Sequence, residues 1–111
     1  MSAWKLPGLL TEAGFRAWLQ RHAPDATVGR SSDRCHCPIA RYVTETLAGE
    51  IDHAAVGRYG TSVLYRDDTS EYSPLPVPLA RFVIELDRGA GFAPVTAGDA
   101  LALLDDIGRG R

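Results

Sequence analysis

Apolar residues recur at the spacing of a helix face in two stretches of the N-terminal half. The first predicts a helix over residues 12–22, with Thr11 before it as a type of residue that caps helix N-termini. The second predicts a helix that begins at Pro38, because proline suits the first helical position. Gly49 then stands where a helix ends in left-handed geometry. The apolar positions are Phe15, Trp18 and Leu19 in the first stretch, and Ile39, Tyr42, Val43 and Leu47 in the second.

The C-terminal half shows the same helical spacing twice. One helix is predicted over residues 78–88, with Gly89 ending it. The last helix follows Thr96 and Asp99, which form a capping pattern, and it ends at Gly108. The apolar positions are Leu79, Phe82, Val83 and Leu86, and then Ala100, Leu101, Leu104 and Ile107.

Two short runs of β-favouring residues lie between these pairs of helices. Residues 53–59 and 61–66 predict a hairpin, with Gly60 near its turn. Residues 67–73 are polar and predict a loop. The alternating prolines of residues 74–78 predict an extended lead-in to the next helix.

These elements predict a single, mostly helical α+β domain in the order helix, helix, β-hairpin, helix, helix. A length of 111 residues fits one domain, and we expect it to span residues 1–111. Residues 1–8 and 108–111 are expected to fray, as the ends of domains often do.

Composition narrows the function classes. The net charge of −2 gives no reason to expect a nucleic acid or an anionic membrane as the partner. No apolar run reaches the roughly 18–20 residues of a membrane span, and residues 1–5 lack the pattern of a signal peptide. We therefore expect a cytoplasmic protein whose two cysteines are free thiols.

The turn before the Pro38 helix holds both cysteines and is the candidate for chemistry. Cys37 is expected at the N-cap, where the helix dipole and nearby arginines would lower the pKa of its thiol. Cys35 and Arg41 have the C-x₅-R spacing that places a nucleophile and an arginine on phosphate in cysteine-dependent phosphatases. The five residues between them contain no glycine, and Arg34 stands where that pattern has histidine.

The same turn is a candidate anion-binding or partner-binding site through Arg30, Ser32, Arg34 and Arg41. Such a site would take a phosphate group or a nucleic acid, although few arginines are present and a nucleic acid is not favoured. Cys35, His36 and Cys37 are metal-ligand types, but a single intervening residue does not match zinc spacing. No metal or cofactor is expected.

No motif of a known enzyme class is present, and catalysis is not expected. The main hypothesis is a small binding or regulatory module that contacts another protein or a second copy of itself. The alternative is a thiol-dependent activity, or a phosphate-binding or nucleic-acid-binding site, at the Cys35–Arg41 turn. The aromatic residues that could lie at an interface are Trp4, Trp18, Tyr42, Tyr59, Tyr65 and Tyr72. Packing in the core is the alternative for each of them, and it is the stronger alternative for Trp18.

Overall fold

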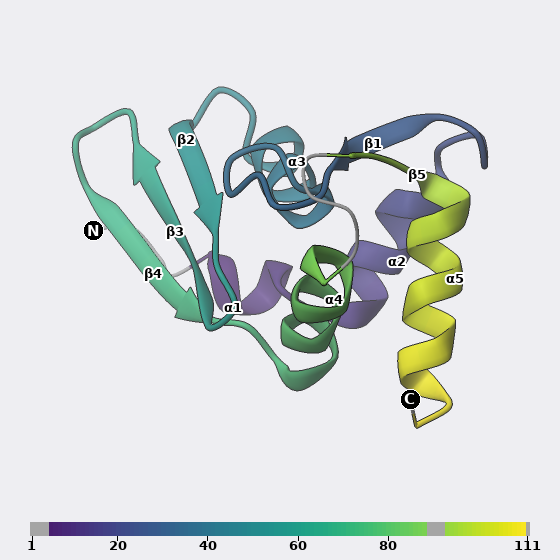
Figure 1. Cartoon of the computed structure of the whole chain (residues 1–111). Coiled ribbons are helices and arrows are strands. Elements are labelled where there is room, and N and C mark those ends of the chain that lie inside the picture. Colours follow the sequence, from purple (N-terminus) through teal and green to yellow (C-terminus); the bar gives the residue numbers. More distant parts are fainter. Residues whose placement is uncertain (1–4, 89–92, 111) are drawn as a thin grey trace.

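The computed structural model describes residues 5–88 and 93–110 (Figure 1). These residues form helices and strands in mixed order. In chain order they are α1 (Leu6–Leu9), α2 (Glu12–Gln20), β1 (Thr27–Arg30), α3 (Pro38–Thr46), β2 (Ile51–Val56), β3 (Gly60–Tyr65), β4 (Ser70–Pro74), α4 (Val77–Asp87), β5 (Pro94–Thr96) and α5 (Ala97–Gly108).

The fold is α+β, but the prediction of a mostly helical domain in the order helix, helix, β-hairpin, helix, helix is wrong, because the structure is 44% helix and 24% strand and its strands form two sheets. The four predicted helices correspond to α2, α3, α4 and α5, and the predicted hairpin corresponds to β2 and β3. Three strands and one short helix were not predicted. Residues 6–8, expected to fray, belong to α1, in which Leu6 is fully buried. The predicted helix stop at Gly89 lies outside the described residues.

The caps expected from the sequence are present. Thr11 accepts a hydrogen bond from the Gly14 N–H at 3.0 Å, and Thr96 accepts one from the Asp99 N–H at 3.1 Å. Local chemistry therefore sets where α2 and α5 begin.

Strands β2, β3 and β4 form an antiparallel sheet in that order. The helices lie to one side of this sheet, and its other face is left uncovered by helices (Figure 1). Along the register, Ala54, Val63 and Glu71 are buried, whereas Ser62 and Tyr72 are exposed. The sheet thus has one face on the core and one face toward solvent.

Strand β4 was predicted as a loop because its buried positions are not apolar. Its burial alternates, with Glu71 and Ser73 inside and Tyr72 outside. Only 4% of Glu71 is exposed, and its carboxylate accepts hydrogen bonds from the backbone N–H groups of Lys5 and Leu6 at 3.3 and 3.1 Å. The Tyr65 hydroxyl donates to the same carboxylate at 2.5 Å. Burial and this bond raise the pKa of Tyr65 to about 12.

Strands β1 and β5 form a second, two-stranded antiparallel sheet. Gly29, which was expected in a turn, lies in β1 opposite Val95. A Cβ added at Gly29 would lie 2.6–2.8 Å from backbone atoms of His36, Cys37 and Pro38. The Arg30 N–H also donates to the His36 carbonyl at 2.9 Å. Glycine is therefore what lets β1 cross the start of α3.

An aromatic cluster joins α2, α3 and α4. The Phe15 ring lies 5.2 Å from that of Phe82 and 5.7 Å from that of Tyr42, between ring centroids. Trp18 also belongs to this cluster. The polar groups of Tyr42 and Trp18 are hydrogen-bonded: the Tyr42 hydroxyl donates to the Leu9 carbonyl at 2.8 Å, and the Trp18 indole N–H donates to the Glu45 carboxylate at 3.0 Å. Helix α5 covers this cluster from the side away from the larger sheet (Figure 1).

Replacing Gly29 by alanine is expected to lower the free energy of unfolding by roughly 2 kcal/mol or more, because the added methyl meets backbone that cannot rotate away. Chemical denaturation measures this change. Gly8→Ala is the matched control, since a Cβ there meets nothing within 4 Å. Equal stabilities of the two variants would contradict the close approach at Gly29.

Glu71→Gln is expected to destabilise the fold by about 2 kcal/mol, because it replaces charge-assisted hydrogen bonds in a buried position. Asp68→Asn removes a charge from the exposed β3–β4 loop, at a residue with φ of 68° that asparagine tolerates, and should change stability by less than about 0.5 kcal/mol. Urea melts of both variants test the difference. A Glu71→Gln protein as stable as the wild type would contradict the role assigned to the carboxylate.

Candidate functional site

Cys37 occupies the N-cap of α3, as predicted, and its sulfur accepts a hydrogen bond from the Ala40 N–H at 3.5 Å. The side chain is buried, with 6% exposed. Burial raises the pKa of the Cys37 thiol to about 11, which is opposite to the lowering expected from the helix dipole. The expectation failed because it counted the charges near the thiol and not the loss of solvent around it. At neutral pH this thiol is protonated and enclosed.

The Cys35–Arg41 turn does not form a phosphate cradle. The Cys35 N–H donates to the Asp33 carboxylate at 3.2 Å, and the Cys37 N–H donates to the Asp33 carbonyl at 2.8 Å. The Arg41 N–H donates within the helix to the Cys37 carbonyl at 3.0 Å. Since these amides bind groups of the turn itself, they are not available to an oxyanion.

The four predicted anion-binding residues do not converge on one point. The Arg41 guanidinium donates to the Thr27 carbonyl at 3.1 Å and to Glu45 at 3.0 Å. The backbone N–H of Ser32 donates to Asp87 at 2.9 Å, and Arg30 lies in β1. Arg34 points elsewhere, into a pocket beside the β2–β3 turn.

Cys35 and Arg41 line a separate pocket of about 360 Å³ beside β2 and α3. His36, in the same pocket, is bound through Nδ1 to the Asp33 carboxylate at 3.0 Å, and this bond lowers the pKa of Asp33. Within residues 5–88 and 93–110, no group of three His, Cys, Asp or Glu side chains is arranged to hold a metal ion.

The structure separates the candidate interface aromatics into two groups. Tyr42 and Tyr65 are buried in the core, so the interface hypothesis is wrong for them, and Trp18 is buried in the core as its stronger alternative predicted. Trp4 lies outside the described residues. Tyr59 and Tyr72 remain exposed, at 79% and 57%, and both line the pocket that Arg34 enters.

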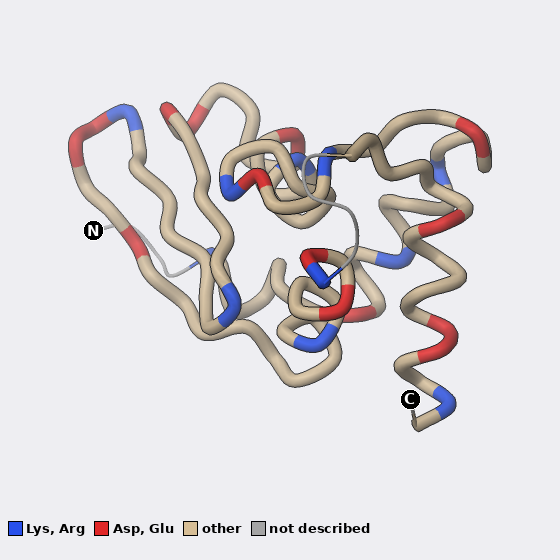
Figure 2. The backbone as a smooth tube through the Cα atoms, viewed as in Figure 1, with Lys and Arg blue, Asp and Glu red and all other residues tan. Residues whose placement is uncertain are grey.

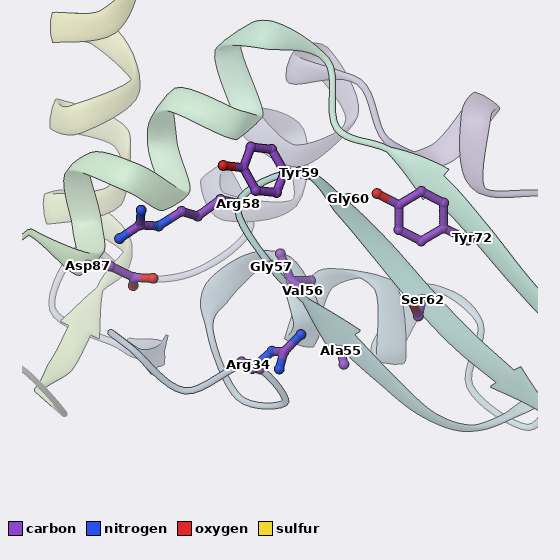
Figure 3. Close-up of a pocket in the computed structure, with 10 residues that line it drawn as sticks. All are labelled: Arg34, Ala55, Val56, Gly57, Arg58, Tyr59, Gly60, Ser62, Tyr72 and Asp87. Atoms are coloured by element: carbon purple, nitrogen blue, oxygen red, sulfur yellow. The ribbon is translucent and has the colours of Figure 1, made fainter.

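This pocket, which we name the Arg–Tyr pocket, has a volume of about 430 Å³. Figure 3 shows it between the β2–β3 turn, the loop that carries Arg34 and the C-terminal end of α4. Its lining residues are Arg34, Ala55, Val56, Gly57, Arg58, Tyr59, Gly60, Ser62, Tyr72 and Asp87.

Backbone hydrogen bonds hold the walls of the Arg–Tyr pocket in place. The Gly57 N–H donates to the Gly60 carbonyl at 3.0 Å and closes the β2–β3 turn. The Val56 N–H donates to the Arg34 carbonyl at 2.8 Å, which ties the Arg34 loop to the free edge of β2. The Tyr72 ring lies over Gly60, where any Cβ would overlap it. Both tyrosines and both arginines therefore extend from anchored backbone.

The pocket brings together two positive charges that lack an acidic partner. Among the residues that the structure describes, neither Arg34 nor Arg58 forms an ion pair. Asp87 lies at the rim and uses one carboxylate oxygen to accept from the Ser32 N–H. Arg58 was not among the predicted site residues, although its place with Tyr59 between two turn glycines, Gly57 and Gly60, is typical of an exposed pair.

Comparison of the chain with protein-family models, with curated proteins and with solved structures gives no match. Among the described residues, none of the helices combines the length and the apolar character that crossing a membrane requires.

The two thiols are expected to differ sharply in reactivity. At pH 8 a disulfide reagent should modify Cys35, which is exposed, and leave Cys37 unmodified until the protein is unfolded. The protection should persist from pH 7 to pH 9, because a pKa of about 11 leaves little thiolate in that range. Thiol counting with and without denaturant measures this, and Cys35→Ser should abolish the native-state reaction. Prompt modification of two thiols in the folded protein would contradict the burial of Cys37.

Proposed function

We propose that the protein is a binding module that acts through contacts with another protein, and that the Arg–Tyr pocket is the centre of its binding surface. The observation that carries the proposal is the grouping of Tyr59 and Tyr72 with Arg34 and Arg58 around one concavity. Tyrosine and arginine are enriched at protein interfaces and dominate their energetic centres.

The exposed apolar residues support the same location. Three large hydrophobic side chains are exposed in the described part of the chain: Tyr59, Tyr72 and Val77. Tyr59 and Tyr72 line the pocket. Val77 lies close to it in the chain, two residues after Leu75, whose N–H donates to the Tyr59 carbonyl at 3.0 Å. Because the other large apolar side chains among the described residues are buried or partly buried, this concentration at one end of the sheet favours a contact surface there.

A second copy of the chain is the alternative partner. We also propose a cytoplasmic location, supported by two cysteines that are free thiols, one of them exposed. The thiol-dependent and phosphate-binding alternatives have less support, since the amides of the Cys35–Arg41 turn are bonded within the turn.

Photo-crosslinking in the source cells tests the proposed surface. A benzophenone amino acid at position 59 or 72 should give a discrete crosslinked product, whereas the same group at exposed Gln20 or Arg66 should not. A product of twice the chain mass would identify a second copy, and any other discrete mass would identify a different protein. The proposal fails if positions 59 and 72 give no product, or give the same products as the controls.

A further inference from the structure

We infer that the Arg–Tyr pocket recognises an acidic segment of the partner protein, with Arg34 and Arg58 binding its carboxylates. This inference rests on the proposed function and names the chemistry of the partner. It predicts a ligand class that exposed tyrosines alone would not specify.

The charge that lines the pocket supports this inference, although some other arginines of the described chain do form ion pairs. Arg16 binds Asp105 at 2.7 Å, Arg41 binds Glu45 at 3.0 Å, and Arg109 binds Asp106 at 2.6 Å. Arg34 and Arg58 form no such ion pair in the described chain, and neither do Arg21, Arg66 and Arg81, but Arg34 and Arg58 are the two of these that line the Arg–Tyr pocket together. A guanidinium presents a planar set of N–H donors that matches a carboxylate, so two unpaired ones around one concavity favour an acidic ligand.

The shape of the pocket lets both groups reach one ligand. Arg34 lies below the β2–β3 turn with its guanidinium against Gly57, at 3.8 Å from the position of a Cβ there. Arg58 projects from the turn itself and lies on the α4 side (Figure 3). A chain segment laid across Gly57 would thus have a guanidinium on either side.

The tyrosines supply the remaining contact area. Tyr72 lies across Gly60 on the exposed face of the sheet, and the Tyr59 ring lies on the other side of Gly60, toward α4 (Figure 3). Their rings can pack against apolar or aromatic side chains that alternate with the acidic ones. Aromatic rings contribute large contact areas with few rotatable bonds, which lowers the entropic cost of binding.

A nucleic acid fits the pocket less well than an acidic peptide. Nucleic-acid affinity grows with the number of phosphates neutralised, and this pocket offers two arginines beside the carboxylate of Asp87. The whole chain carries a net charge of −2. Figure 2 shows acidic and basic positions interspersed over the described backbone, without a continuous basic track. A short acidic peptide, in contrast, can bind through the two arginines of the pocket alone.

Nuclear magnetic resonance titration of the ¹⁵N-labelled protein tests the ligand class. The probe is an acetylated, amidated pentapeptide, Glu-Glu-Tyr-Glu-Glu, and its comparison is the uncharged Gln-Gln-Tyr-Gln-Gln. We expect the acidic peptide to cause saturable shifts at the amides of Gly57, Tyr59, Gly60 and Tyr72, and the uncharged peptide to bind several-fold more weakly.

Four variants make the test specific. Arg34→Gln and Arg58→Gln should each weaken binding of the acidic peptide by about three-fold, as expected for exposed ion pairs. Arg66→Gln, which removes an exposed arginine at the other end of β3, should leave binding unchanged. Asp87→Asn should strengthen binding, because it removes a negative charge from the rim and keeps the oxygen that accepts from Ser32.

Three results would overturn the inference: equal binding of the two peptides, equal loss in Arg34→Gln and Arg66→Gln, or tighter binding of oligothymidylate than of the acidic peptide. Crosslinking at positions 59 and 72 together with any of these would leave the binding surface in place and remove only its acidic ligand. Acidic-peptide binding without crosslinked products would instead remove the proposed function.

Discussion

The close backbone contact between β1 and the start of α3 is the constraint on which the candidate site depends. Gly29 has no side chain, and this lets β1 lie against the backbone of residues 36–38. The contact fixes the turn that precedes α3, and the Arg34 carbonyl in that turn then accepts the Val56 N–H. One steric condition therefore links the small sheet, helix α3 and the edge of the larger sheet, and it places Arg34 beside the β2–β3 turn.

A second constraint holds the opposite edge of the larger sheet. The buried carboxylate of Glu71 joins β4 to the first backbone N–H groups of the chain that the structure describes and to the Tyr65 hydroxyl. A charge in that position is stable only because several donors surround it. Because these bonds fix the inner face of the sheet, Tyr72 lies on the outer face, where it is exposed and lines the Arg–Tyr pocket.

Tyrosine and cysteine each occur in this molecule both in the core and on the surface, and their exposure to solvent decides their role. Tyr42 and Tyr65 are buried with their hydroxyls bonded to Leu9 and Glu71, whereas Tyr59 and Tyr72 are exposed beside two arginines. Cys37 is a buried cap and Cys35 is exposed. Because Cys37 is buried, it does not supply the reactive thiol expected at the turn before α3. The surface best suited to binding a partner lies at the neighbouring β2–β3 hairpin.

The sequence by itself determined the four main helices and the β2–β3 hairpin, because helical spacing, caps and β-favouring runs are local signals. Thr11, Cys37 and Thr96 begin their helices as their positions indicate. Tertiary structure alone decided β1 and β5, whose pairing joins residues more than sixty positions apart, and β4, whose buried positions are Glu71 and Ser73. It also decided which tyrosines are exposed and that Arg34 and Arg58 line one pocket, since burial and convergence depend on packing between distant segments.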